Sequence, residues 1–386
     1  MGYPAVFSQI VKQIPRSKFE SWVQKHEADK GVRSLDSWTW FGALLFGQLT
    51  GHDSIRAIER VFATSDPTMK KMGFGPVRKS TLADANRVRS LGVLEDCFAF
   101  ALSRARELSP KSAFRFKGDV FALDSSTIEL CLSLSPWAQF HHGQGACKLH
   151  TAIDLAGDLP EVAVITSGRV HDVRVARNLK NPRLLSAGAT WIMDRAYVDY
   201  GWLSELNQKG VFFVTRAKSN CRFKVRKSRK TDRTRGHICD QEIYLKSQRG
   251  RRYKGKLRRI RFRDPDTAKS LTFLTNRMDL ATQTICDLYK ARWKVELFFK
   301  TLKQYLRVKK FLGTSANAVK AQILVALIAY LLVQILRFAH RSYISIADAM
   351  AVVGTLLLLK EPLSRLLGSL PRVTRHPPTL QMELDL

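Results

Sequence analysis

Three acidic residues have the types and surroundings that could support metal-dependent chemistry. Asp124 directly follows the apolar run Val120–Leu123, and Asp194 follows Trp191–Met193 in the same way. Both aspartates are therefore expected at the ends of short strands, and two such ends can be neighbours in one sheet. The third residue, Glu296, lies on a predicted helix. Carboxylate oxygens can bind Mg²⁺, but a strand-end aspartate commonly caps a turn, and for either aspartate alone that interpretation is favoured.

The predicted helix around Glu296 carries a row of polar residues. Tyr289, Arg292, Glu296 and Lys303 are separated by three, four and seven positions. At about 100° per helical residue they fall within an arc of about 60°. A neighbouring stripe of similar width is apolar and predicts the buried face; it consists of Leu288, Val295, Phe299, Leu302 and Leu306. An ordinary amphipathic helix has the same pattern, so spacing alone favours no catalytic role.

The order Asp, Asp, Glu, with Tyr289, Arg292 and Lys303 around the glutamate, resembles the insertion-sequence transposases of the four-series group, which belong to the DDE superfamily. The segments 123–127 and 193–197 also resemble the surroundings of that family's two aspartates. The resemblance covers roughly residues 115 to 345. It implies an α/β fold with a ribonuclease-H-like catalytic core, in which helices flank a mixed sheet and a β-rich insertion precedes the glutamate helix.

The resemblance also implies a reaction and its cofactor. Asp124, Asp194 and Glu296 would be the catalytic residues and would hold two Mg²⁺ ions, for which Mn²⁺ can substitute. Asp124 would bridge the ions, and each of the other two carboxylates would hold one. Two such ions can stabilise the attacking and leaving oxygens during displacement at phosphorus. Water would free a 3′-hydroxyl at the element's end, and that hydroxyl would attack target DNA, in related enzymes through a hairpin intermediate.

Four residues on the glutamate helix are candidate contacts to DNA phosphates or bases. Arg292 and Lys303 suit phosphates near the cut, and Tyr289 could donate to a phosphate oxygen. Trp293 could stack on a displaced base, although a tryptophan in a helix is more often packed. The pair His171–Asp172 resembles a family feature near the third strand, to which we assign no role.

The pattern of elements along the chain predicts three regions. Residues 1–110 form a helical N-terminal domain, which we expect to recognise DNA ends. Residues 111–345 form the catalytic domain, with a basic β-rich insertion at about 216–275. Residues 346–386 form a helical C-terminal region and a tail. The apolar run Ile323–Val333 is shorter than the roughly 20 residues that cross a bilayer, so it predicts a buried core helix and no membrane partner.

The composition points to nucleic acid as the partner. The chain has 64 Lys and Arg against 33 Asp and Glu, a formal charge of +31, which favours binding to a polyanion. Residues 216 to 263 hold 20 of these cations and three acids. We therefore expect this segment to contact the backbone of double-stranded DNA. The six cysteines are scattered singly, which is typical of a reducing cytoplasm rather than a disulfide framework or zinc site.

Two other functions are compatible with these features. A ribonuclease-H-like nuclease would use the same metal site but would not join strands. A catalytically inactive DNA-binding regulator fits the charge, but it leaves the full set of acidic residues unexplained. For a transposase, pairing two element ends implies at least a homodimer in the active complex.

Overall fold

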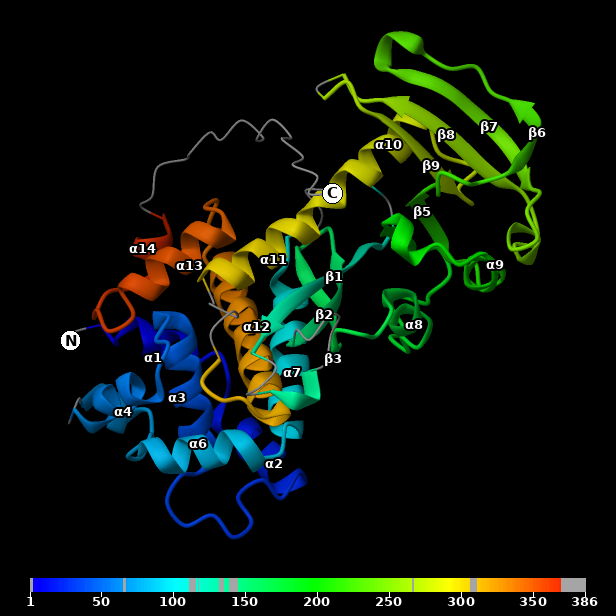
Figure 1. The fold of residues 1–386 in the computed structure, drawn as a ribbon. Helices are drawn as coiled ribbons and strands as arrows, with labels where there is room; N and C mark the ends of the chain where they lie inside the picture. Colours follow the sequence, from blue (N-terminus) through cyan, green and yellow to red (C-terminus); the bar gives the residue numbers. More distant parts are fainter. Residues whose placement is uncertain are drawn as a thin grey trace.

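The computed structural model describes residues 3–64, 67–110, 116, 118–131, 135–138, 145–265, 267–305 and 311–368. Within these residues, nine strands form one sheet, and helices cover both faces of its first five strands (Figure 1). The strands are β1 Val120–Leu130, β2 Gly145–Asp154, β3 Leu159–Ser167, β4 Thr190–Met193, β5 Phe212–Arg216, β6 Phe223–Ser228, β7 His237–Leu245, β8 Leu257–Arg263 and β9 Ser270–Thr275.

The first five strands have the ribonuclease-H-like arrangement that the family resemblance implies. Their order is β3-β2-β1-β4-β5. Strand β2 is antiparallel to both β1 and β3, whereas β1, β4 and β5 run parallel to one another. Parallel neighbours need a crossover connection. Helix α9, Tyr200–Gln208, supplies it between β4 and β5, and the shorter α8, Asp172–Arg177, lies between β3 and β4.

Alternating side chains on the central strands enter two separate cores. Ala122, Ile192 and Val214 point to the face that packs with the N-terminal helices and the later helices. Phe121 and Trp191 point to the opposite face, which α8 and α9 cover. Because successive residues of a strand alternate between faces, strands buried on both sides consist of nearly continuous apolar residues, as β4 does.

The basic insertion continues the same sheet instead of forming a separate one. Strand β9 pairs with β5, and β8, β7 and β6 follow in antiparallel order. This part of the sheet extends away from the N-terminal helices (Figure 1). Of the 20 cations in residues 216–263, 16 are exposed. Arg258 is instead buried and ion-paired with Asp240, so part of the basic composition has a structural role.

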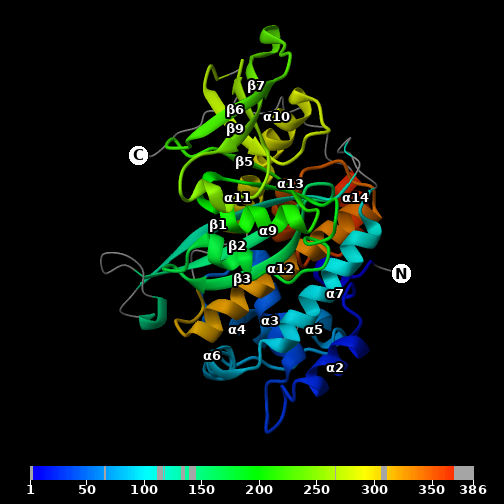
Figure 2. The same ribbon diagram turned by 90° about the vertical axis from the view of Figure 1, so that its right-hand side faces the viewer.

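The remaining helices pack around one long central helix. The seven N-terminal helices are α1 Val6–Val11, α2 Arg16–Lys25, α3 Ser37–Thr50, α4 Ile55–Ala63, α5 Pro67–Lys71, α6 Lys79–Val88 and α7 Gly92–Leu108. The central helix α12, Ala316–Ala339, packs against α3, α6 and α7, and α13, Ile346–Thr355, also contacts it (Figure 2). The last described helix is α14, Leu363–Gly368; residues 369–386, which include the predicted tail, lie outside the described residues.

The apolar composition of α12 reflects this central position. The helix is long and apolar enough to cross a membrane, but 94% of its most apolar window is buried inside the protein. Ser315 caps its first turn by accepting a hydrogen bond from the backbone N–H of Ala318. The prediction of a buried core helix is therefore confirmed. The N-terminal helices, α12 and one face of the sheet share one continuous core.

The glutamate helix differs from the prediction of one continuous helix through Leu306. It consists of α10, Thr282–Ala291, and α11, Trp293–Tyr305, which meet at Arg292. The N–H of Arg292 bonds to the carbonyl of Tyr289, and the N–H of Val295 bonds to the carbonyl of Arg292. Both bonds span three residues, so the chain tightens there as in a 3₁₀ turn. Leu306 lies outside the described residues.

Candidate active site

The two aspartates occupy equivalent positions on neighbouring parallel strands. Strand β1 does not end before Asp124 as predicted, because its pairing with β2 continues to Leu130. Its parallel pairing with β4 does end there: the last pair is Leu123 with Met193. Asp124 and Asp194 therefore both follow the final paired position. The prediction that the aspartates lie side by side is consistent with this register, although Asp124 lies within a strand.

The backbone around Asp194 is fixed by its neighbours. The residue precedes a short 3₁₀ turn, Arg195–Tyr197. Its carbonyl accepts a hydrogen bond from the hydroxyl of Thr215 on β5 at 3.2 Å. The side chain of Asp194 is partly exposed, so its carboxylate remains accessible while its main chain is held to the sheet.

Arg292 joins two of the three acidic residues. Its guanidinium forms ion pairs with Asp124 at 3.2 Å and with Glu296 one helical turn further along. Only 16% of the Arg292 side chain is exposed. Burial by itself lowers the pKa of Arg292, but Tyr289, Asp124 and Glu296 outweigh it and raise the pKa. Arg292 is therefore a permanent cation between these carboxylates.

The pKa of Asp124 reflects both its burial and the nearby charges. Burial is the largest cause and raises the pKa of Asp124 to about 6, although Arg292 and the backbone N–H of Ser125 act to lower it. The charges of Glu296 and Asp194 raise it further. All three carboxylates thus interact electrostatically. A site that crowds negative charge in this way favours a bound cation.

Tyr289 contacts the remaining acidic residue, Asp194. Its hydroxyl lies 3.5 Å from a carboxylate oxygen of Asp194 and donates to it. Its ring is largely buried, lies beneath the guanidinium of Arg292, and packs on Phe273 of β9 at a centroid distance of 4.7 Å. The structure therefore places Tyr289 between the insertion strands and Asp194, and it contributes to orienting that carboxylate.

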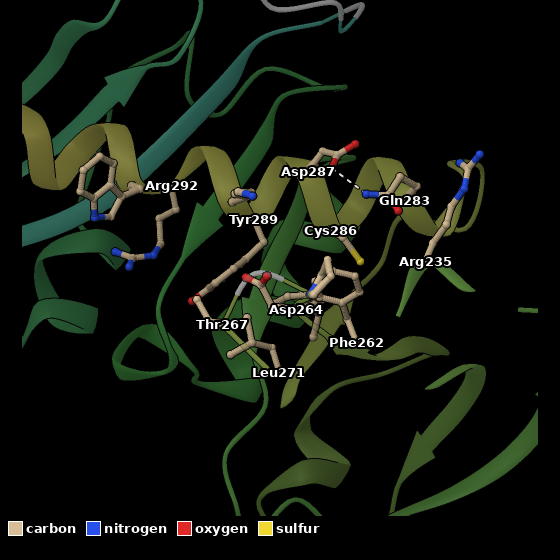
Figure 3. Close-up of a pocket in the computed structure, with 14 residues that line it drawn as sticks. Arg235, Phe262, Asp264, Thr267, Leu271, Gln283, Cys286, Asp287, Tyr289 and Arg292 are labelled. Carbon is tan, nitrogen blue, oxygen red and sulfur yellow. Dashed lines mark hydrogen bonds between the residues drawn. The ribbon is translucent and has the colours of Figure 1, made fainter. Parts of the chain in front are cut away.

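The other two predicted DNA contacts are Trp293 and Lys303. Trp293 is half-buried and lines a cavity of about 410 Å³ between α10 and the strands β8 and β9. In Figure 3, Tyr289 projects from α10 and Arg292 projects from the end of α10, on one side of this cavity. Phe262 on β8 and Leu271 on β9 also line the cavity. Lys303 lies on α11, two turns beyond Glu296, and is half-buried.

The donor set suits a hard divalent cation, but the side chains do not converge on one point. Within the described parts of the chain, no group of three or more His, Cys, Asp or Glu side chains is arranged to hold a metal ion. Asp124 and Glu296 are instead joined through Arg292. All-oxygen donors on three separate elements nevertheless match the chemistry of Mg²⁺, which needs few protein ligands because it retains waters.

The structure adds neighbours of Asp124 that the sequence interpretation did not assign. Ser125 hydrogen-bonds to Asp172, and Lys148 and His150 on β2 also face Asp172. Lys148 and His150 alternate along β2, so they share one face of the sheet. Their partner, Asp172, could not be inferred from the sequence, because it lies at the start of α8, which follows β3. The neighbouring His171 precedes α8 and forms no side-chain cap.

Comparison with known proteins identifies the class. Residues 115–332 match the family described as "Transposase DDE domain", and residues 3–75 match a domain of unknown function. A Sinorhizobium fredii protein named as transposase y4zB is 33% identical over 66% of this chain and 70% of its own length. A Geobacillus stearothermophilus protein named as the transposase of insertion sequence element IS5377 is 30% identical over 66% of each chain.

Two further matches are more distant. A Synechocystis protein named as the transposase of insertion sequence element IS4SA is 24% identical over 67% of this chain and 71% of its own length. A solved structure of the piggyBac transposase synaptic complex with hairpin DNA is 12% identical and covers 92% of this chain and 80% of its own, with a TM-score of 0.49.

The fold and the family match define a DDE transposase, an enzyme that acts on DNA and depends on divalent metal. The chain belongs to the transposase DDE domain family and is related to the transposases of bacterial insertion sequences. The predictions of the superfamily, the ribonuclease-H-like core and the enzyme class are confirmed. The assignment of the three carboxylates and of the four-series group remains a prediction.

Proposed function

We propose that this transposase cuts DNA at the ends of an insertion sequence and joins them to target DNA, with Asp124, Asp194 and Glu296 as its catalytic and metal-binding residues. The observation that carries the proposal is the contact set around Arg292 and Tyr289, which links all three carboxylates at the end of the parallel pair β1 and β4.

The cofactor of this proposal is Mg²⁺, with Mn²⁺ as a substitute. Two such ions, when bound, would stabilise the attacking and leaving oxygens at phosphorus. The chain's own residues would hold and orient the DNA. Arg292 presents a planar fork of donors that matches a phosphate, and Lys303 on α11 supplies a second positive charge. Trp293 borders the apolar cavity beside Arg292, which supports the proposal that it stacks on a displaced base.

The exposed cations of β6 to β8 support a second DNA contact. Their charge suits the DNA backbone, which carries no sequence information by itself. Recognition of element ends would then fall to the N-terminal helices. Arg56 and Arg60 on α4 are exposed and make suitable targets. Their replacement by alanine should reduce the preference for element ends over random DNA, while metal-dependent nicking continues. Retention of the full preference would place recognition elsewhere.

Deleting the N-terminal helices would not test recognition. Helices α3, α6 and α7 cover α12, so their removal would expose the central core. Surface substitutions avoid this problem because they leave the core intact. The remaining proposals are a homodimer in the complex that pairs two ends, and a bacterial cytoplasmic location.

The strand-joining activity can be tested separately from cleavage. A precut element end with a free 3′-hydroxyl is mixed with plasmid and Mg²⁺, and joined product is measured. The wild-type protein should give joined product, and Asp124→Asn, Asp194→Asn and Glu296→Gln should each give none. Cleavage without any joining would identify a nuclease. Absence of both activities in the wild-type protein would favour a DNA-binding regulator.

The route of excision has its own test. If cleavage passes through a hairpin, denaturing gels of single-turnover reactions should show a closed-end species that appears before the final products. Reactions in which the final products form without that species would contradict the hairpin route and would leave the strand-joining proposal intact.

A further inference from the structure

The hydroxyl of Ser125 lies at the centre of a hydrogen-bond group behind Asp124. It donates to a carboxylate oxygen of Asp172 at 2.8 Å, and the buried phenol of Tyr197 interacts with it electrostatically. The backbone N–H of Ser125 donates to one carboxylate oxygen of Asp124, also at 2.8 Å. One residue thus connects Asp124 with Asp172 at the start of α8.

Asp172 is itself held from the neighbouring strand β2. The ammonium of Lys148 lies 3.4 Å from Asp172, and Nδ1 of His150 lies 3.5 Å from the same oxygen. Burial lowers the pKa of His150 to about 4 despite the opposing charge of Asp172. His150 is therefore neutral at neutral pH, so Lys148 is the cationic partner of Asp172. These three side chains are at most 20% exposed, which limits their freedom to move.

Tyr197 completes the group from the side of Asp194. Only 3% of this residue is exposed. Burial is the largest cause of its raised pKa, and the carboxylates of Asp124, Asp172 and Asp194 raise the pKa further. The phenol keeps its proton for that reason. It is a neutral hydrogen-bonding group close to three carboxylates.

We propose that Asp172 is a positioning residue for Asp124 and acts through the hydroxyl of Ser125. Asp124 is oriented at one oxygen by the N–H of Ser125 and at the other by Arg292. The hydrogen bond to Asp172 fixes Ser125, so it fixes the direction of that N–H. The proposal rests on the proposed role of Asp124 as a metal ligand. Residues that orient metal ligands typically change metal affinity by about 10- to 100-fold when replaced.

The test compares Mn²⁺ binding and DNA cleavage in variants of the full chain. Mn²⁺ affinity is measured by electron paramagnetic resonance of the free ion, without DNA. Asp172→Ala and Ser125→Ala should each weaken Mn²⁺ binding by about 10- to 100-fold, and their cleavage rates should recover substantially at saturating Mn²⁺. Ser125→Thr keeps the hydroxyl and should bind Mn²⁺ as the wild-type protein does.

Two further variants separate positioning from a general structural effect. The double variant Ser125→Ala/Asp172→Ala should bind Mn²⁺ no more weakly than the worse single variant, because the two residues act through one contact. Asp119→Ala is the matched control, since Asp119 pairs with Arg183 at the opposite end of β1. It should leave Mn²⁺ affinity unchanged. If Asp172→Ala fails to fold, Asp172→Asn keeps an acceptor for Ser125 and should bind Mn²⁺ more tightly than Ser125→Ala.

Any one of three results would overturn the inference. Asp172→Ala could bind Mn²⁺ with wild-type affinity, the double variant could show fully additive losses of Mn²⁺ affinity, or Ser125→Thr could fail to retain Mn²⁺ binding. Asp124→Asn identifies which proposal has failed. If Asp124→Asn retains both Mn²⁺ binding and cleavage, the proposed function of Asp124 is wrong. If Asp124→Asn loses both while Asp172→Ala behaves as wild type, the positioning role alone is wrong.

Discussion

The buried ion pair between Arg258 and Asp240 gives the most quantitative prediction about how the basic insertion supports the site. The two side chains are 1% and 0% exposed. The guanidinium of Arg258 donates to both oxygens of Asp240 and to the carbonyl of Leu280, just before α10. It therefore connects strands β7 and β8 with the start of the helix that carries Tyr289.

The perturbation is Arg258→Met, which preserves much of the volume and leaves the Asp240 charge buried without its partner. Removing one member of a buried pair costs about 3–5 kcal/mol. Native-state hydrogen exchange of the β7 and β8 amides measures this cost locally. Their protection should fall by a factor of about 10² to 10⁴, since 1.4 kcal/mol corresponds to about a factor of ten.

The pH dependence of this effect follows from Asp240. Burial raises the pKa of Asp240, but the hydrogen bonds from Arg258 and Thr282 outweigh burial, and the net pKa is lowered. The stabilisation by the pair is thus present at neutral pH and is lost only as pH falls through the lowered pKa. In Arg258→Met the unpaired carboxylate can take up a proton at higher pH. The difference between the two proteins should therefore shrink toward pH 4.

Two control variants make the reasoning refutable. Arg261→Met changes an exposed arginine on the same strand and should alter protection by less than about 0.5 kcal/mol. The double variant Arg258→Met/Asp240→Leu removes both charges and should recover most of the lost protection. A loss below about 1 kcal/mol in Arg258→Met, or a double variant less protected than the single one, would refute the account of the buried pair.

Three other predictions concern catalysis, DNA binding and the core. Arg292→Lys should lower the cleavage rate at least about tenfold in single-turnover assays, because a lysine cannot present the planar fork of donors that matches a DNA phosphate; an unchanged rate would contradict this role. Replacing Lys224, Arg226 and Lys227 by glutamate should weaken DNA binding and reduce the salt-dependence slope by about 0.9 for each lost phosphate contact, as fluorescence anisotropy across a salt series would show. Leu331→Ala in α12 should destabilise the protein by about 2–5 kcal/mol in urea unfolding, whereas a loss under about 1 kcal/mol would argue against tight packing there.

Local patterns were sufficient to predict most of the elements. The apolar runs Val120–Leu123 and Trp191–Met193 marked two of the central strands, and the apolar sequence of α12 indicated its burial. The break at Arg292 could not be predicted in this way, because the apolar stripe continues through both helices. The extension of β1 beyond Asp124 was also missed, since residues 124–127 are polar and are held in the strand by pairing with β2.

The site was predictable only where residues are close in sequence or match a family pattern. The polar row from Tyr289 to Lys303 lies on adjacent helices, and its spacing is visible in the sequence. The contacts of Arg292 with Asp124 and of Ser125 with Asp172 join residues that are 168 and 47 positions apart. Such pairs depend on the sheet order and on side-chain directions, which no short pattern specifies. The buried role of Arg258 was hidden for the same reason among many exposed cations.

The measurement that tests the central claim most directly is a crystal structure of the wild-type protein with Mn²⁺, in which anomalous scattering locates the ions. The account predicts Mn²⁺ coordinated by Asp124, Asp194 and Glu296, with Arg292 moved out of its ion pair with at least one of them. Mn²⁺ bound at other residues under saturating conditions, with Arg292 still joining Asp124 and Glu296, would contradict it.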